Sequence, residues 1–234
     1  MNQFKGEIKI IGTGSYAPRN VVTNEMLAAK LRTDASWIKK NLGIDERRIA
    51  DDNEATSDLA YQAGLKAIEN AKLSVDDIDL IIVATATPDR KAPSTACIVQ
   101  EKLQAFNSFA FDVSAVCTGF LTAMSVASQF IHSGTCKNVL VIGADKFSSI
   151  TDWNRRDAVF FGDGAGAAIL TGGANEAGFL SFNLYSDGRG KNAFTVPAGG
   201  SEQPLNVDNV KNGEHYFQMD GVDATVYGIN MSTR

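Results

Sequence analysis

Cys117 is the residue of this chain whose setting in the sequence can support covalent chemistry. It follows a β-type run, Phe109-Ala-Phe-Asp-Val113, and precedes an apolar helical pattern that continues to His132. A thiol at the N-terminus of a helix lies at the positive end of the helix dipole, which favours the nucleophilic thiolate. Backbone N–H groups at such a helix start can also stabilise an oxyanion. The residues alone leave a second interpretation open, because a free cysteine is most often a small buried apolar side chain.

The other two cysteines, Cys97 and Cys136, lack this strand-to-helix setting and are predicted to be structural. The three cysteines stand about twenty residues apart without a C-x-x-C pair, which argues against a disulfide framework and against a zinc site. The N-terminus has no apolar run of the signal-peptide type, and no uncharged stretch is apolar enough for a membrane-spanning helix. We therefore expect a reducing compartment, the cytoplasm, and no bound metal.

Two glycine-rich stretches superficially resemble phosphate-binding loops. The run from Gly12 to Gly14 follows a predicted strand, but Pro18 prevents the immediate helix that a dinucleotide fingerprint needs. The run from Gly162 to Gly166 leads into a strand instead of a helix, where glycine is expected to permit close backbone packing or positive φ. The sequence therefore argues against a nicotinamide or ATP site.

The overall charge excludes a general attraction for anionic partners. The 234 residues carry a formal net charge of −5, so nucleic acid or anionic lipid would have to be met by a local basic site. Residues 30–48 provide such a region, because they hold six basic and three acidic side chains. The apolar and charged fractions of 44% and 21% also exclude a disordered or fibrous chain.

The elements that position these residues follow from hydrophobic periodicity. Continuous apolar runs predict buried strands, and apolar residues at helical spacing predict helices between them. Strands are expected at residues 7–15, 80–86, 109–113, 139–144 and 165–170, and helices at 25–32, around Trp37, at 56–71 and at 117–132. This alternation predicts an α/β fold with a mostly parallel sheet between helices. Beyond residue 173 we expect a loop or hairpin at 186–211 and the start of a helix at 221–234.

Five stretches, taken in order and spacing, carry a resemblance to a known family. They are IIGTGSYAPRNVVTN (residues 10–24), WIKKNLGIDERRIA (37–50), LIIVATATPDRKAPSTAC (80–97), FDVSAVCTGF (111–120) and FGDGAGAAIL (161–170). Together they resemble β-ketoacyl-acyl-carrier-protein synthase III, a thiolase-fold condensing enzyme. The resemblance implies a layered thiolase-like α/β fold, with a complete N-terminal half over residues 1–173 and an incomplete C-terminal half begun over residues 174–234.

The same resemblance implies an activity and its partners. Cys117 corresponds to the cysteine that accepts an acyl group from acyl-CoA before decarboxylative condensation with malonyl-acyl-carrier protein in fatty acid biosynthesis. The implied partners are acyl-CoA, acyl-carrier protein and a second copy of the chain in a homodimer. Acyl-CoA is a substrate, so no resident cofactor is implied.

Further residues are expected to contact substrate on the strength of the resemblance. Trp37 falls where the family stacks a tryptophan on the adenine of CoA, Arg155 where a cation covers the same adenine, and Thr33 near the CoA entrance. Trp37 could instead be wedged in a helix interface, and surface Arg and Thr are usually solvated. Asn41 stands where many members have arginine. Ala92 stands where many have a bulky residue, which predicts a roomier acyl pocket for longer or branched groups.

One departure from the family concerns its second catalytic step. The histidine of the family's Pro-His-Gln-Ala-Asn stretch, and the partner asparagine, have no counterpart in this sequence. His132 and His215 fall outside that motif and are interpreted as structural or surface residues. We therefore expect a truncated copy that does not complete condensation alone. The alternatives are a non-condensing acyl-binding protein and a non-catalytic dimerisation scaffold.

Overall fold

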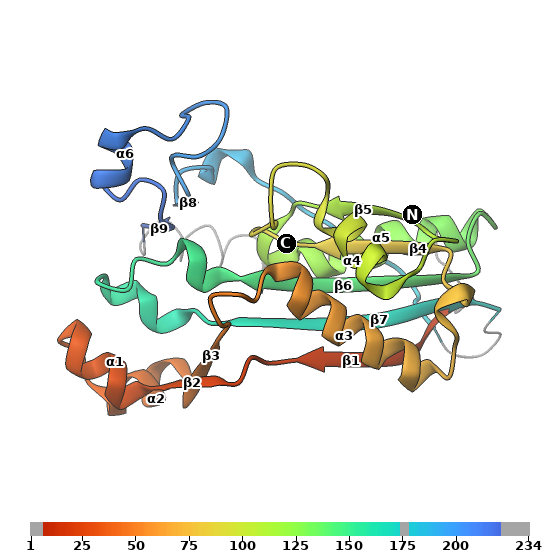
Figure 1. Cartoon of the computed structure of the whole chain (residues 1–234), viewed down its shortest axis with the longest axis horizontal. Coiled ribbons are helices and arrows are strands. Elements are labelled where there is room, and N and C mark those ends of the chain that lie inside the picture. The colour runs from red at the N-terminus through yellow and green to blue at the C-terminus, as the bar shows by residue number, and fades with distance from the viewer. Residues whose placement is uncertain (1–6, 174–177, 221–234) are drawn as a thin grey trace. The chain divides into compact units, whose positions relative to one another are not determined.

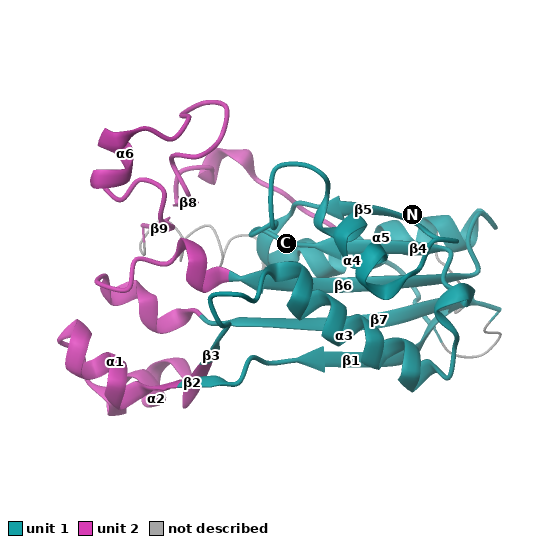
Figure 2. Cartoon of the chain, in the orientation of Figure 1, with its two compact units in different colours: residues 1–21, 48–146, 162–182 teal, residues 22–47, 147–161, 183–234 magenta. Residues whose placement is uncertain are grey.

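The computed structural model describes residues 7–173 and 178–220, so the helix expected at 221–234 lies outside the described residues. The chain divides into two compact units (Figure 2), each built from separated stretches. Unit 1 comprises residues 1–21, 48–146 and 162–182, and unit 2 comprises residues 22–47, 147–161 and 183–234. These compact units have other boundaries than the two halves expected from the family resemblance, and the division into halves stays a prediction.

Unit 1 is built on a five-stranded sheet in the order β1-β7-β6-β4-β5 (Figure 1). The strands are β1 (Ile8–Tyr16), β4 (Leu80–Ala84), β5 (Phe109–Val113), β6 (Asn138–Lys146) and β7 (Asp163–Gly172). β4 pairs in parallel with β5 and β6, whereas β7 runs antiparallel to β6 and β1. The sheet is therefore mixed, and the expectation of a mostly parallel sheet was wrong. A continuous apolar run indicates that both faces of a strand are buried, but it does not indicate the direction of the strand. An antiparallel strand covered by helices on both faces has the same apolar run as a parallel one.

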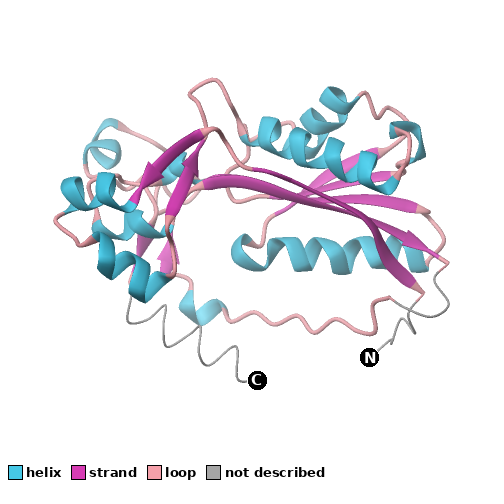
Figure 3. Cartoon of the chain, turned by 90° about the horizontal axis from the view of Figure 1, so that it is seen from below, coloured by secondary structure: helices cyan, strands magenta, loops and turns pink. Residues whose placement is uncertain are grey.

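Helices cover both faces of this sheet, as Figure 3 shows. One core contains buried residues of α3 (Thr56–Ala71) and α4 (Thr95–Leu103) with strand residues such as Ile81 and Leu140. The other core contains residues of α5 (Gly119–His132) with the alternate strand residues, such as Ile82 and Val141. This alternation along each strand gives two hydrophobic cores, one on each side of the sheet.

The glycines of β1 serve the close approach of α3. A Cβ at Gly14 would lie 2.1 Å from the Ala63 carbonyl oxygen, and one at Gly12 would lie 2.5 Å from the Ala67 carbonyl oxygen. Alanines on the facing side of α3 permit the same approach. Helix packing therefore accounts for this glycine run without a bound nucleotide.

Several expected elements coincide with the observed ones. α3 and β5 have the expected bounds, and α1 (Asn24–Leu31) begins after the N-cap Thr23, whose side chain accepts a hydrogen bond from the Met26 amide. The helix expected from residue 117 begins as α5 at Gly119, because a short 3-10 turn over Val116–Thr118 precedes it. The strand expected over 80–86 ends at Ala84.

Unit 2 has its own small core. α1, α2 (Ala35–Leu42) and the 3-10 turn η4 (Arg156–Phe160) enclose a cluster of buried apolar residues: Leu27, Leu31, Ile38, Ala158 and Val159. The remaining elements are short, namely η3 (Phe147–Ile150), η5 (Gly188–Gly190), β8 (Phe194–Thr195), α6 (Val207–Lys211) and β9 (Gln218–Met219). The chain passes between the units within β2 (Asn20–Thr23) and β3 (Glu46–Ile49), which pair with each other. No helix in the described part of the chain is long and apolar enough to cross a membrane.

Candidate functional site

Cys117 is exposed in the 3-10 turn that joins β5 to α5 in unit 1. The residue before it, Val116, has a φ of +45°, in the left-handed region that a β-branched side chain disfavours. The hydroxyl of Thr118 donates to the Ala115 carbonyl oxygen at 3.0 Å, which closes the turn around the cysteine. A strained turn that presents an exposed thiol is typical of a functional position, because strain persists only where surrounding structure holds it.

The helix behind Cys117 is seated tightly on two strands. A Cβ at Gly119 would lie 3.2 Å from the Cβ of Ala84, the last residue of β4. A Cβ at Gly143 of β6 would lie 3.2 Å from the ring of Phe120. Close contact at both strands fixes the first turn of α5, and with it the place of the thiol.

The burial of the three cysteines distinguishes Cys117 from the others. Cys136 is buried in the α5 core, and this burial, with the nearby Asp79 carboxylate, raises the pKa of its thiol. Cys97 is half-buried on α4, where its sulfur accepts from the Ser94 hydroxyl at 3.1 Å and lies 3.7 Å from the Ala110 carbonyl oxygen. Of the three cysteines, Cys117 is the most exposed.

The strain at Val116 leads to a stability prediction. Val116→Gly is expected to raise the free energy of unfolding by up to about 1 kcal/mol. Relief of about 1–3 kcal/mol of backbone strain exceeds the roughly 0.5–1 kcal/mol entropic cost of glycine. Urea unfolding measures the change. Val21→Gly is the control, because Val21 is a comparably exposed valine in a strand, and its replacement is expected to destabilise. Equal losses in both variants would show that Val116 is not strained.

Two half-buried carboxylates organise the loop after β4, and sequence reasoning missed them. Asp145 Oδ1 accepts from the Thr85 hydroxyl (3.1 Å), the Ala86 amide (2.8 Å) and both the amide and hydroxyl of Thr87 (3.1 and 2.8 Å). Asp112 accepts from the Thr95 and Ala96 amides at 2.7 Å and so caps α4. An aspartate near the end of a mainly apolar strand is the signal that marks both positions.

Ala92 lies in this loop and is exposed. It does not line either of the two cavities described below, so its assignment to an acyl pocket stays a prediction.

Trp37 lies on α2 in unit 2. The carboxylate of the N-cap Asp34 accepts from the amides of Ser36 (2.6 Å) and Trp37 (3.4 Å), and the fully buried Ile38 anchors the helix in the core. Trp37 is 37% exposed as a residue, which argues against a tryptophan wedged inside a helix interface. It therefore presents an aromatic face to ligand or solvent.

The cation stacked on Trp37 is Arg156. Its guanidinium carbon lies 4.7 Å from the centroid of the indole. Arg155, the residue expected there, instead pairs with Asp157, with Nη2 at 3.0 Å from Oδ2. Because Arg155 and Arg156 are adjacent, the sequence does not show which of them contacts the indole. The turn η4, which begins at Arg156, orients that residue toward the ring.

Two cavities open beside this tryptophan. The first, of about 470 Å³, is lined by Trp37, Arg155, Arg156, Asp157, Val159, Phe160 and Met219. The second, of about 630 Å³, is lined by Arg32, Thr33, Asp34, Ser36, Trp37, Lys40, Asn41 and Arg156. The structure therefore brings the expected residues Thr33, Trp37 and Arg155 to one region of unit 2.

A buried arginine, also missed from the sequence, supports this region. Arg47 donates to the Val22 carbonyl (3.1 Å), the Asn24 side-chain oxygen (2.8 Å) and the Val159 carbonyl (3.2 Å). Burial lowers the pKa of its guanidinium. Arg47 thereby ties the start of α1 to η4, the turn that carries Arg156.

The two histidines have structural surroundings. His132 ends α5, about 20 Å of helix away from the Cys117 turn, and its Nδ1 lies 3.5 Å from the Glu7 carboxylate. The ring of His215 lies against that of Tyr216, with centroids 3.9 Å apart and the ring planes tilted by 38°. Within residues 7–173 and 178–220, no group of three or more His, Cys, Asp or Glu side chains is placed to hold a metal ion.

Comparison with known proteins decides the family. A family model described as 3-oxoacyl-[acyl-carrier-protein (ACP)] synthase III matches residues 111–188, a range that contains Cys117. A β-ketoacyl-[acyl-carrier-protein] synthase III from Clostridioides difficile is 48% identical over 221 residues, which cover 94% of this chain and 67% of that protein. The chain belongs to the β-ketoacyl-[acyl-carrier-protein] synthase III family. Members of this family are condensing acyltransferases of fatty acid biosynthesis.

Solved structures of synthase III confirm the thiolase-like α/β fold. The 3-oxoacyl-[acyl-carrier-protein] synthase III from Aquifex aeolicus VF5 is 41% identical with a TM-score of 0.76, and the match covers 92% of this chain and 65% of that one. The enzyme from Pseudomonas aeruginosa PAO1 is 34% identical with a TM-score of 0.82, covering 95% and 66%. The chain thus spans about two thirds of the length of the synthase III proteins that it matches. That share does not test the expected truncation, which stays a prediction.

Proposed function

We propose that this chain performs the acyl-transfer step of a β-ketoacyl-[acyl-carrier-protein] synthase III, with Cys117 as the acyl acceptor. The observation that carries the proposal is the exposed thiol in a strained turn at the head of a tightly seated helix. The Cys117 sulfur attacks the thioester carbonyl of acyl-CoA and forms a tetrahedral oxyanion. Collapse of this intermediate breaks the bond to the CoA sulfur, which leaves and takes up the proton, so Cys117 carries the acyl group.

Unit 2 supports coenzyme A as the acyl donor. Trp37 and the Arg156 guanidinium offer an aromatic and cationic pair beside a cavity, a combination suited to a purine ring. Arg155 and Thr33, assigned to the CoA site from the sequence, line the same two cavities and remain part of the proposal. The acylated cysteine would then meet malonyl-acyl-carrier protein, the partner of the family's condensation step. We also propose that the protein acts as a homodimer in the cytoplasm.

Intact-mass measurement tests the proposal. Incubation of the chain with acetyl-CoA is expected to add the mass of one acetyl group, and peptide mapping is expected to place it on Cys117. If the chain gains no acyl mass, the proposal fails, as a non-catalytic dimerisation scaffold would require. Acylation without 3-oxoacyl product on addition of malonyl-acyl-carrier protein would identify a non-condensing acyl carrier, and product formation would identify a complete synthase.

Ala92 leads to a prediction about the acyl chain. Because alanine replaces a bulky residue there, octanoyl-CoA is expected to acylate Cys117 within about tenfold of the acetyl-CoA rate, since added methylenes find room. Ala92→Phe is expected to slow the octanoyl reaction at least about tenfold and to leave the acetyl reaction unchanged. An enzyme that takes only acetyl groups, or a variant that slows both reactions equally, would refute this role.

A further inference from the structure

We propose that Asp145 is a positioning residue, which fixes the loop of residues 85–94 beside the Cys117 turn and thereby sets which acyl chains Cys117 accepts. The inference rests on the proposed function, because it takes Cys117 as the acyl acceptor. It goes beyond that function by giving a role in acyl-chain selection to a carboxylate that acts through a loop and not on the reacting atoms.

The loop of residues 85–94 and the Cys117 turn leave the sheet next to each other. Strands β6, β4 and β5 are neighbours in that order and run in parallel, so their carboxyl ends lie at one edge of the sheet. The loop follows β4, and the Cys117 turn follows β5. The Thr85 amide donates to the carbonyl oxygen of Val113, the last residue of β5, at 3.3 Å. Ligands of open α/β sheets bind beyond the carboxyl ends of the strands, so this loop is positioned to form one side of the acyl site.

Asp145 holds the first turn of this loop from the β6 side. Its Oδ1 accepts four hydrogen bonds, from the Thr85 hydroxyl, the Ala86 amide, and the amide and hydroxyl of Thr87. The amide of the next residue, Lys146, donates to the Thr87 hydroxyl at 3.0 Å, which also bonds the turn to the backbone of β6. Thr85 and Thr87 are only 6% and 7% exposed, so water cannot readily replace the carboxylate as their acceptor. Loss of the carboxylate is therefore expected to displace the turn.

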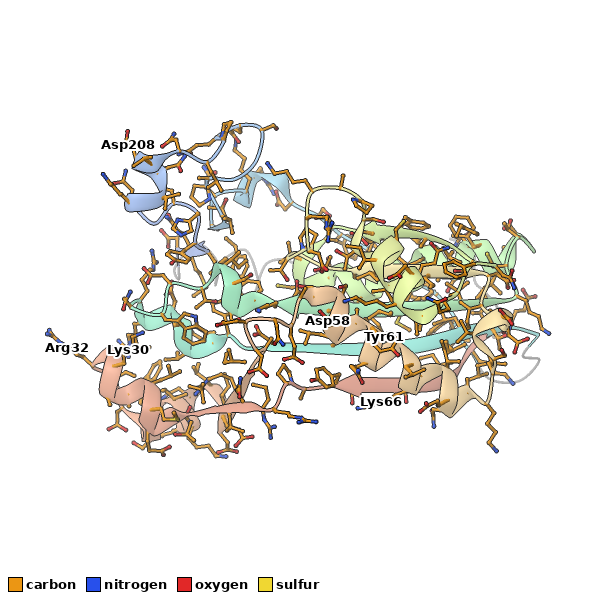
Figure 4. All side chains as sticks on the ribbon, viewed as in Figure 1. Lys30, Arg32, Asp58, Tyr61, Lys66 and Asp208 are labelled. Carbon is orange, nitrogen blue, oxygen red and sulfur yellow. The ribbon has the colours of Figure 1, made fainter. Side chains whose placement is uncertain are left out.

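The middle of the loop is attached to helices and not to β6. The Asp89 carboxylate accepts from the amide and the hydroxyl of Ser57 at 2.8 and 2.6 Å. Ser57 precedes Asp58, which Figure 4 labels in the first turn of α3, and Lys102 of α4 donates to both side chains at 2.8 and 2.6 Å. The helices therefore fix the middle of the loop, whereas its first turn, the part that is bonded to β5, depends on Asp145.

The position of this loop affects long acyl chains more than short ones. An acetyl group on Cys117 ends close to the sulfur, whereas an octanoyl group has to lie along the surrounding protein. A misplacement of about 1 Å can cost on the order of a hundredfold in rate when the displaced part has to position the substrate. Displacement of the loop is therefore expected to slow acylation by the long chain and to spare acylation by the short one.

Acylation rates with two acyl-CoA substrates, measured by intact mass, test the inference. Asp145→Ala is expected to slow acylation of Cys117 by octanoyl-CoA at least about tenfold and to leave the acetyl-CoA rate within about threefold. Asp145→Asn keeps an oxygen acceptor for the same donors, so it is expected to restore the octanoyl-CoA rate to within about threefold of the unaltered chain.

Asp79→Ala is the matched control. Asp79 is a half-buried aspartate that directly precedes β4, at the opposite end of that strand from the loop. Its Oδ2 accepts from the amides of Lys137 and Asn138 at 2.7 and 2.9 Å. The substitution thus also removes a carboxylate that organises a turn, and it is expected to leave the ratio of the octanoyl-CoA rate to the acetyl-CoA rate unchanged.

Trypsin digestion of the folded chain tests the loop itself, independently of catalysis. Arg90 and Lys91 are exposed in the loop, so the rate of cleavage after either residue reports how firmly the loop is held. Asp145→Ala is expected to raise this rate at least about fivefold, and Asp79→Ala to leave it unchanged. If Asp145→Ala does not fold, Thr85→Val replaces it, because it removes one donor to the carboxylate and keeps the side-chain shape. Thr85→Val is expected to change both measurements in the same direction by about two- to threefold.

The outcomes distinguish a failure of the inference from a failure of the proposed function. If neither acyl-CoA acylates the unaltered chain, the proposed function fails and the inference fails with it. If Cys117 is acylated but Asp145→Ala slows both reactions equally or slows neither, the assignment to Asp145 is wrong and the proposed function stands. The same holds if the unaltered chain accepts acetyl-CoA alone, if Asp79→Ala changes the rate ratio as much as Asp145→Ala does, or if tryptic cleavage is as slow in Asp145→Ala as in the unaltered chain.

Discussion

Cys117→Ser is expected to lower the rate of acyl transfer from acyl-CoA on the order of a thousandfold or more. A serine hydroxyl is ionised far less than a thiol near neutral pH, so the variant presents far less of the nucleophilic anion to the thioester carbonyl. Stopped-time intact-mass measurement gives the rate directly. The substitution removes no packing, because the side chain is exposed and the two residues are nearly the same size.

The matched controls are the two other cysteines. Cys97→Ser and Cys136→Ala are expected to leave the acylation rate within about threefold of the unaltered chain. Cys136→Ala is expected to lower stability by about 1 kcal/mol, because its side chain is in the α5 core. Iodoacetamide should react with Cys117 before Cys136, whose raised pKa and burial protect it. Acylation that survives in Cys117→Ser would remove this residue from the mechanism.

Gly14→Ala is expected to destabilise the protein by about 3 kcal/mol or more, at the upper end of overpacking effects. The added methyl group would lie 2.1 Å from the Ala63 carbonyl oxygen and 2.5 Å from the Ala67 backbone nitrogen. Both contacts are with helix backbone, which cannot rotate away as a side chain can. The whole of α3 would have to move from a core in which Ala63 and Ala67 are fully buried. For a chain of this length the loss corresponds to roughly 6–12 °C in Tm.

Gly166→Ala is the control, because Gly166 lies on the neighbouring strand β7, where it pairs with Ser15 of β1. A Cβ there meets nothing within 4 Å, so the change is expected to stay within about 0.5 kcal/mol. Thermal unfolding followed by circular dichroism compares the two variants. Equal stability of Gly14→Ala and Gly166→Ala would mean that α3 does not lie as close to β1 as described.

The sequence was informative wherever the signal was local. Apolar periodicity placed α3 and β5 at their observed bounds, and the helix expected over residues 25–32 lies within one residue of α1 at each end. The direction of a strand within the sheet could not be predicted from its own residues. β7 contains a buried apolar run, residues 167–170, of the same kind as β4, but it runs antiparallel to its neighbours because of how the chain returns to the sheet.

The features of the site also divide into those that the local sequence predicts and those that depend on contacts between distant residues. The local sequence predicted that Cys117 lies between a strand and a helix. It also predicted that Trp37 lies on a short helix. The choice of Arg156 over Arg155 depends on the orientation of a single 3-10 turn. The support from Arg47 depends on a contact with Val159, 112 residues away in the sequence, which no local pattern reveals.

That long-range contact has a consequence for the order of folding. Unit 2 is assembled from stretches that unit 1 separates in the chain, and Arg47 joins two of them across 112 residues. Contacts of large sequence separation require the closure of long loops, which slows their formation. Helix α3 is formed by consecutive residues and can form early. The η4 turn packs into the core of unit 2 only after residues 48–146 have folded. The cavities beside Trp37 are therefore expected to mature late, so that nucleotide binding reports completed folding.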